Sequence, residues 1–253
     1  MNSFHTPPTM LDMTQKLSVD IERVFSVEQR EAAEFLQKHI FPELLEDHFF
    51  LVGGTALALR FGHRRSIDLD FFSFPFNSTY DGEIEIVDKI LRKHGIYHRK
   101  DIVPISGQLH CQINNVMVLF AVFQNFTADH ENEFYQVPLY PPEKTAFGFD
   151  TLSLKDLAGM KAFARCHRSK MKDLVDIGEI LTHGISLQEI IDVTERQFGY
   201  DISGKEILES CLNIDDILDN AIDEPIVFLN DKDIAYYIDL LKIEIAKYYH
   251  ANI

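Results

Sequence analysis

The first 140 residues mix segments with the hydrophobic period of a helix and segments with the period of a strand. Residues 27–39 and 81–95 carry apolar side chains about one helical turn apart, which predicts two amphipathic helices. Residues 67–72 alternate apolar and polar side chains, the period of two that is typical of a strand. Because Asp68 and Asp70 are two positions apart in this strand, their carboxylates are predicted to lie on the same face.

Turn residues indicate where these elements end. Residues 49–54, FFLVGG, predict a strand that ends in a tight Gly-Gly turn, and the helix that follows is expected to use Thr55 as its capping residue. Two apolar runs, residues 109–113 and 116–123, flank the asparagine pair at 114–115. Asparagine tolerates the positive φ of a tight turn, so these runs predict a β-hairpin.

Beyond the prolines at 141 and 142 the pattern is helical to the end of the chain. Four segments have helical periodicity, at residues 153–166, 169–184, 186–199 and 231–250. The sequence therefore predicts an α+β fold in two domains. Residues 1–140 would form a mixed β-sheet core with an N-terminal helix and flanking helices, and residues 141–253 a helical domain.

Composition narrows the class of protein. With 253 residues, of which 46% are hydrophobic and 25% charged, the chain can bury a sizeable core, which excludes a disordered or fibrous protein. No stretch approaches the roughly 18 apolar residues of a membrane span, and no basic segment precedes an apolar one at the N-terminus. We therefore expect a soluble, cytoplasmic protein without a membrane partner. The three cysteines are too scattered for a disulfide framework or zinc knuckle and are expected to be thiols.

The net charge of −16 argues against indiscriminate binding of nucleic acid, which requires a broad surplus of lysine and arginine. The charge is uneven, because residues 1–172 carry a net charge of −3 and residues 173–253 a net charge of −13. A polyanionic ligand could still bind locally at two basic clusters in the first part: Arg60, Arg64 and Arg65, and then Lys161, Arg165, Arg168, Lys170 and Lys172.

A Gly-Gly turn followed by two aspartates forms a site with a clear chemical rationale. Gly53 and Gly54, at the start of a helix, let backbone N–H groups and the helix dipole approach a phosphate. Asp68 and Asp70 supply the oxygen ligands that a hard cation such as Mg²⁺ or Mn²⁺ prefers. Together these groups predict phosphoryl or nucleotidyl transfer.

The segments LVGGTALALRFGHRRSIDLDFFSF and SLKDLAGMKAFARCHRSKMKDLVDI resemble the AbiEii/AbiGii toxin family of nucleotidyltransferases, over roughly residues 45–200. The resemblance implies a nucleotidyltransferase-like fold. It also implies that Gly53, Gly54 and Thr55 bind the triphosphate, with Arg65 and Ser66 as further candidate contacts. Asp68 and Asp70 would be catalytic residues and metal ligands. Lys161 and Asp173 would be catalytic residues from the helical domain, which thereby completes the active site.

Many nucleotidyltransferases carry a third carboxylate on a later strand, but the predicted strand at residues 116–123 has none. This departure leaves three alternatives. Asp173 supplies the missing carboxylate, or metal affinity and turnover are reduced, or the protein is a catalytically inactive module that binds a nucleotide or a partner.

The resemblance implies a metal-dependent enzyme that moves a nucleoside monophosphate from a nucleoside triphosphate (NTP) to a hydroxyl. It further implies the toxin half of a toxin–antitoxin or abortive-infection system, with a cognate antitoxin protein as partner. The acceptor is a tRNA 3′ end in related toxins and a protein hydroxyl in other branches of the superfamily. The acidic helical region argues against tRNA, whereas the basic clusters could face an RNA.

Overall fold

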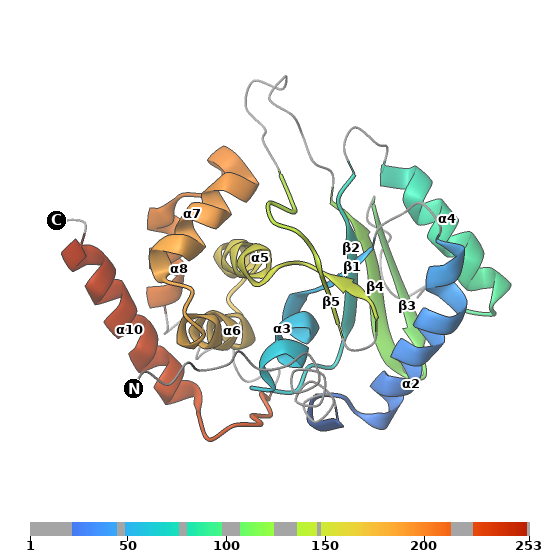
Figure 1. The fold of residues 1–253 in the computed structure, drawn as a ribbon, viewed down its shortest axis with the longest axis horizontal. Coiled ribbons are helices and arrows are strands. Elements are labelled where there is room, and N and C mark those ends of the chain that lie inside the picture. Colours follow the sequence, from blue (N-terminus) through green and yellow to red (C-terminus); the bar gives the residue numbers. More distant parts are fainter. Residues whose placement is uncertain are drawn as a thin grey trace, which may run out of the picture.

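The computed structural model describes residues 22–44, 49–75, 80–97, 107–123, 136–145, 148–213 and 225–251 of the chain. Within these residues a six-stranded mixed sheet has the strand order β3-β4-β2-β1-β6-β5 (Figure 1). The β2–β4 and β1–β6 pairs are parallel and the other pairs are antiparallel. The strands are β1 (Phe50–Val52), β2 (Leu69–Ser73), β3 (Gln108–Ile113), β4 (Val116–Val122), β5 (Glu143–Lys144) and β6 (Asp150–Thr151).

Helices cover both faces of this sheet and form the C-terminal half of the molecule. In Figure 1, α2 and α4 lie on one side of the sheet, whereas α3 and α5 lie on the other, with the remaining helices beyond them. The helices are α2 (Val27–Phe35), its continuations η1 (Leu36–Ile40) and η2 (Phe41–Glu43), α3 (Gly53–Phe61), α4 (Tyr80–Lys93), α5 (Leu154–His167), α6 (Met171–Thr182), α7 (Leu187–Phe198), η3 (Gly199–Asp201), α8 (Gly204–Leu212) and α10 (Ile234–Ala251).

This architecture confirms the predicted α+β fold with a mixed sheet, flanking helices and a helical C-terminal part. The short strands β5 and β6 follow residue 140 in the sequence and nevertheless join the sheet. The division into domains at this residue stays a prediction. None of the described helices combines the length and apolar composition needed to cross a membrane.

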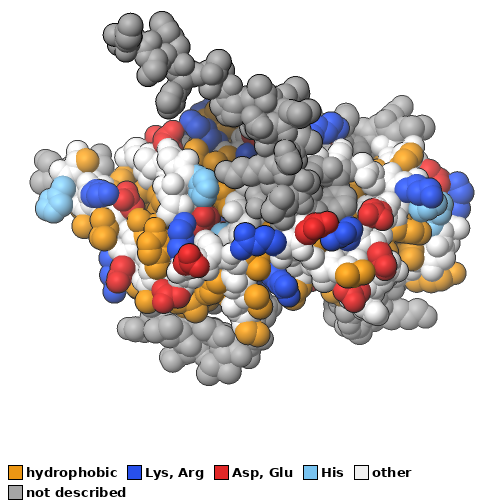
Figure 2. Space-filling view, turned by 60° about the horizontal axis from the view of Figure 1, so that its bottom comes forward, with side chains coloured by type: hydrophobic (Ala, Val, Ile, Leu, Met, Phe, Trp, Pro, Cys, Tyr) orange, Lys and Arg blue, Asp and Glu red, His pale blue; other side chains and the backbone are white. Residues whose placement is uncertain are grey.

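The surface shows no separation of charge on the face drawn in Figure 2. Lysine and arginine side chains are interspersed there with aspartate and glutamate, and hydrophobic side chains lie between them. The three cysteines are free thiols, as expected from their spacing, and two of them, Cys111 and Cys211, are buried.

The β-hairpin forms at the predicted place. Asn114 and Asn115 have φ angles of 48° and 64°, and the register pairs Ile113 with Val116 on either side of the turn. An asparagine side chain tolerates this left-handed backbone because it hydrogen-bonds locally. The turn therefore fixes the register in which β3 meets β4.

The predicted cap of α3 is wrong. The helix begins at Gly53, with Val52 as its N-cap, so Thr55 lies inside the first turn. Gly53 has a φ of 69°, a conformation that glycine adopts without cost, and the chain passes directly from β1 into the helix. The buried hydroxyl of Thr55 instead lies 2.8 Å from Oγ of Ser66 and also contacts the backbone oxygen of Asp68.

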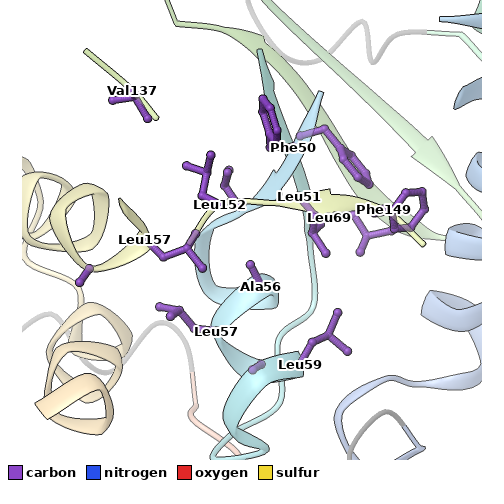
Figure 3. Close-up of a cluster of buried hydrophobic side chains, with 14 of the residues drawn as sticks. Phe50, Leu51, Ala56, Leu57, Leu59, Leu69, Val137, Phe149, Leu152 and Leu157 are labelled. Carbon is purple, nitrogen blue, oxygen red and sulfur yellow. The ribbon is translucent and has the colours of Figure 1, made fainter. Parts of the chain in front are cut away.

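One hydrophobic core joins the sheet to the helices of the C-terminal half. Figure 3 shows Leu51 of β1 and Leu57 of α3 in the same cluster as Leu152 and Leu157, which belong to the start of the helical part. On the other face of the sheet, the rings of Phe71 of β2 and Phe120 of β4 stack with centroids 5.5 Å apart. Because α3 lies within this core, its N-terminus has a fixed position between the two halves.

The C-terminal segment returns to the loop that precedes the aspartates. The N–H of Arg65 donates to the carbonyl of Val227 at 2.9 Å, and the N–H of Leu229 donates to the carbonyl of His63 at 2.9 Å. Arg64 and Phe228 form the β-bridge between these two bonds. Chain segments more than 160 residues apart thus hold the loop between α3 and β2.

Burial in this core predicts that two substitutions, one on α3 and one on α10, differ in their effect on stability. Leu57→Ala removes a fully buried side chain between the two halves and should lower the free energy of unfolding by about 2–5 kcal/mol, because it leaves a cavity. Ile243→Ala, at a side chain that is 53% exposed on α10, should change it by less than about 1 kcal/mol. Urea denaturation checks this, and equal losses in the two variants would contradict the role given to α3.

Candidate active site

Asp70 lies directly beside the Gly-Gly turn. It is the second residue of β2, and the register pairs it with Val52, the last residue of β1. A Cβ at Gly53 would lie 2.8 Å from Oδ2 of Asp70, which is closer than real Cβ atoms approach. Glycine at this position therefore allows both the positive φ and the approach of the carboxylate to the start of α3.

Asp68 and Asp70 repel each other electrostatically. Burial, and after it the negative charge of Asp68, raise the pKa of Asp70 to about 6. The positive charges of Lys161, Arg168 and Lys172 act in the opposite direction. These three cations come from the helical half, so the fold brings the second basic cluster of the sequence to the aspartates.

The aspartate pair fits a divalent cation. Carboxylate oxygens are the ligands that Mg²⁺ prefers, and magnesium in phosphate-transferring sites is usually held by one or two carboxylates together with substrate phosphates. The described residues contain no group of three or more His, Cys, Asp or Glu that could hold a metal ion. The pKa of Asp70 stays raised because burial and the charge of Asp68 outweigh the three cations.

Lys161 and Asp173, the two residues expected from the helical part, form an ion pair. Nζ of Lys161 lies 3.0 Å from Oδ1 of Asp173. Arg168 also donates to Asp173, from Nε to Oδ2 at 2.7 Å and from Nη2 to Oδ1 at 3.0 Å. Burial would raise the pKa of Asp173, but Lys161 and Arg168 outweigh it and hold the pKa below its ordinary value. Both oxygens of this carboxylate are therefore engaged by cations.

Asp176 is the most highly connected carboxylate near the site. Arg64 donates to both of its oxygens at 2.7 Å, and His63 donates from Nε2 at 2.8 Å. Nζ of Lys161 lies 2.9 Å from Oδ2. Burial opposes ionisation, but Arg64 and Lys161 hold the pKa of Asp176 well below its ordinary value. Asp176 therefore connects the loop after α3 to α5 and α6.

Sequence reasoning did not find the role of Arg64. Its guanidinium lies behind the Gly-Gly turn, so that a Cβ at Gly54 would overlap Nη2. The available signal was its place in the first basic cluster next to Arg65, which does not distinguish the two arginines. The structure does, because Arg64 is buried on Asp176 and Arg65 is exposed.

The other predicted triphosphate contacts are Ser66, in the same loop, and Thr55, in the first turn of α3. Ser66 is half-buried, and its carbonyl accepts a hydrogen bond from Nε2 of Gln29 at 2.7 Å. Thr55 is buried and spans Ser66 and Asp68, so its hydroxyl fixes the loop that leads to the aspartates. The first turn of α3, which begins with Gly53 and Gly54, thus lies beside Ser66 and the backbone of Asp68.

The second basic cluster divides into structural and site residues. Arg165 is buried and donates to the backbone carbonyls of Arg168, at 3.1 Å, and Ser210. Arg168 is 49% exposed and lies close enough to lower the pKa of Asp70. Of these two arginines, Arg168 is the one that an incoming anion can reach.

Comparison with known proteins identifies the family. Residues 34–226 match the sequence model of the family described as nucleotidyl transferase AbiEii toxin, type IV toxin–antitoxin system. The chain belongs to the AbiEii family of nucleotidyltransferases. This confirms the resemblance seen in the sequence, and it makes the protein a transferase.

Individual relatives are more distant. The uncharacterized protein aq_aa25 of Aquifex aeolicus (strain VF5) is 32% identical over 182 residues, which are 70% of this chain and 77% of that protein. The solution structure of the antibiotic-resistance factor ANT(2'')-Ia is similar over 66% of this chain and 91% of its own, with 12% identity and a TM-score of 0.46. Its crystal structure with adenylyl-2"-tobramycin covers 74% and 95% of the two chains, with 13% identity and a TM-score of 0.40.

The aspartate pair predicts an unusual pH dependence of stability. The pKa of Asp70 is raised from 3.8 to about 6 in the folded protein, so the folded state binds more protons than the unfolded state between these values. In metal-free buffer with EDTA, the wild type should lose about 2 kcal/mol of stability relative to Asp70→Asn as the pH rises from about 4 to 7. Urea denaturation at both pH values checks this. Asp239→Asn, at an exposed position on α10, is the control and should follow the pH profile of the wild type. Parallel pH profiles of stability for wild type and Asp70→Asn would contradict the prediction.

The Asp176 contacts predict a large loss of stability. Asp176→Asn leaves Arg64, Lys161 and His63 without their shared negative partner, so it should lower the free energy of unfolding by about 3–5 kcal/mol at pH 7. Asp192→Asn, whose carboxylate is exposed on α7, is the matched control and should cost less than about 0.5 kcal/mol. A loss of the control's size in Asp176→Asn would show that this buried network contributes little.

Proposed function

We propose that this protein transfers a nucleoside monophosphate from an NTP to a hydroxyl of an RNA, such as a tRNA 3′ end, or of a protein. It acts in the cytoplasm as the toxin of a toxin–antitoxin or abortive-infection system, with a cognate antitoxin as its partner. The observation that carries this proposal is the convergence of Gly53, Asp70 and the cations Lys161 and Arg168 around the start of α3.

The proposed triphosphate site uses groups from both halves. The backbone N–H groups at Gly53 and Gly54 begin α3 and point along the positive end of the helix dipole, which favours a phosphate. Ser66 and Arg65 lie in the loop beside this helix start. Arg168 is exposed toward solvent and would neutralise phosphate charge. Lys161 would add its charge from the buried side.

The proposed cation ligands are Asp68 and Asp70. When bound, Mg²⁺ or Mn²⁺ would polarise the α-phosphate and stabilise the leaving pyrophosphate. The chain's own part is to hold two deprotonated carboxylates beside the helix start, where Gly53 leaves room for Asp70. We propose that Asp173 supports this arrangement by holding Lys161 and Arg168 in place, since both of its oxygens bind these side chains.

A second candidate function follows from the strand next to the aspartates. The register places Leu119 of β4 directly beside Asp70, and β4 contains no carboxylate. This observation favours a catalytically inactive protein that binds a nucleotide or a partner with the same fold. The two functions differ in one measurable respect, because a nucleotide-binding module forms no covalent product.

Transfer of labelled nucleotide distinguishes the two functions. Wild-type protein, incubated with Mg²⁺ and each of the four α-³²P-labelled NTPs, should label either total RNA or lysate proteins. Asp70→Asn should lower labelling by at least about 10³-fold while the protein stays folded, because it removes a charge on which phosphoryl transfer depends. Asp150→Asn, at a half-buried position in β6, is the control and should keep activity.

The acceptor that carries the label decides between RNA and protein. Binding of NTP without any labelled product would favour the inactive module. Full activity of Asp70→Asn would contradict the mechanism with two aspartates, whichever acceptor is labelled.

A further inference from the structure

His63 is a fully buried histidine in the loop between α3 and β2, and its two ring nitrogens have different surroundings. Nε2 lies 2.8 Å from Oδ1 of Asp176, whereas Nδ1 has no hydrogen-bond partner within the described residues. A buried N–H group without an acceptor costs free energy, so the ring proton belongs on Nε2, where a carboxylate accepts it. His63 is therefore a donor to Asp176 through one defined nitrogen.

Packing alone does not account for a histidine at this position. The ring of Phe61 meets the ring of His63 edge-on, with centroids 5.9 Å apart. An apolar side chain would fill the same buried space without leaving a ring nitrogen unpaired, and buried polar atoms are normally paired. What the imidazole adds is the N–H group on Nε2, which points to the contact with Asp176 as the purpose of this residue.

The contact fixes a carboxylate that also holds Arg64. Oδ1 of Asp176 accepts from Nε2 of His63 and from Nε of Arg64. Oδ2 accepts from Nη2 of Arg64 and lies 2.9 Å from Nζ of Lys161. A guanidinium that binds both oxygens of a carboxylate lies close to the carboxylate plane. The position of Arg64 therefore depends on how His63 orients Asp176.

Arg64 carries this orientation to the Gly-Gly turn. Its Nη2 atom lies so close to Gly54 that a Cβ at this glycine would overlap it. Its Nη1 atom donates to the carbonyl of Arg65 at 3.0 Å. The guanidinium thus packs between the start of α3 and the loop that leads to Ser66, the two places that the proposed function assigns to the triphosphate.

The backbone of His63 is itself held in place. Its carbonyl accepts from the N–H of Leu229 at 2.9 Å, and its neighbour Arg64 forms a β-bridge with Phe228. The ring therefore extends from a backbone that the C-terminal segment anchors. A donor on an anchored backbone can set the orientation of Asp176 and does not merely follow it.

We propose that His63 is a positioning residue for NTP binding, a role that rests on the proposed function. Through Asp176 it holds the guanidinium of Arg64 against Gly54, and so it sets the geometry in which the start of α3 receives the triphosphate. Because it is fully buried, it touches neither the nucleotide nor the acceptor. Loss of its N–H group weakens NTP binding and leaves the transfer step of the bound complex nearly unchanged.

Three substitutions separate hydrogen bonding from packing, with the Kd of NTP measured by calorimetry in Mg²⁺. His63→Leu fills the space without a donor and should raise the Kd by about tenfold, because a hydrogen bond to a charged group is lost. His63→Gln places an N–H group near the position of Nε2 and should keep the Kd within about threefold of the wild type. His63→Asn places its donor near the position of Nδ1, which finds no acceptor among the described residues, and should resemble His63→Leu.

Kinetics distinguish a positioning role from a general loss of structure. In the labelling assay with α-³²P-NTP, His63→Leu should raise KM for NTP by about tenfold and change kcat by less than about threefold. His183→Leu, at a histidine of α6 whose side chain is 42% exposed, is the control and should keep both constants. If urea denaturation shows that His63→Leu does not fold, the comparison of His63→Gln with His63→Asn decides.

The outcomes for His63 and for the proposed function differ. A wild-type Kd in His63→Leu and His63→Asn, or a Kd in His63→Gln as high as theirs, would overturn the role of His63 and leave the proposed function standing. A wild type that binds NTP but labels nothing would contradict the proposed transfer, whereas the three Kd values would still decide on His63. A wild type that binds no NTP would overturn both.

Discussion

Two buried carboxylates on α6 hold the two halves of the site together. Asp173 and Asp176 lie one turn apart and fully buried, a position that costs free energy unless each charge is paired. Their partners come from different elements, Lys161 from α5 and Arg64 from the loop that precedes the aspartates. Glu179, one turn further, accepts from Tyr237 of α10 at 2.7 Å. One face of a single helix thus organises three separate parts of the chain.

This constraint also positions the charged groups around the start of α3. Asp176 fixes Arg64 behind Gly54, and Asp173 holds Lys161 and Arg168 within electrostatic reach of Asp70. Preorganised charges stabilise a transition state without having to move during the reaction, and this is the largest catalytic contribution in many enzymes. Lys161 and Arg168, however, interact with Asp173 and with Asp70 at the same time. The pKa of Asp70 nevertheless stays raised, because burial and the charge of Asp68 outweigh these cations.

The site also depends on how little space surrounds the Gly-Gly turn. Asp70 approaches Gly53 from β2, and Arg64 approaches Gly54 from the loop after α3, so a methyl group at either glycine would meet a charged side chain. The loop itself is held by Thr55 from within α3 and by the C-terminal segment at residues 227–229. Substitutions in this region would therefore act on binding and on stability together.

The sequence by itself determined the local elements. Alternation over residues 67–72 predicted the strand β2 that carries Asp70, and the asparagine pair placed the hairpin, because these features depend on side-chain periodicity and on φ at single positions. In the structure β2 begins at Leu69, so Asp68 lies just before the strand and its shared face with Asp70 stays a prediction. Family resemblance identified the nucleotidyltransferase, which the match over residues 34–226 confirmed. The start of α3 was predicted wrongly, since a capping threonine and a buried threonine look alike in a sequence.

Only the tertiary structure decided which charged groups meet. Arg64 and Asp176 are 112 residues apart, and neither residue's neighbours in the sequence indicate that the two side chains pair. The position of Leu119 beside Asp70 depends likewise on the strand order β3-β4-β2, which local periodicity does not specify. Periodicity records which face of an element is buried. The element that covers this face, and hence the partner of each buried charge, is set by the packing of the whole chain.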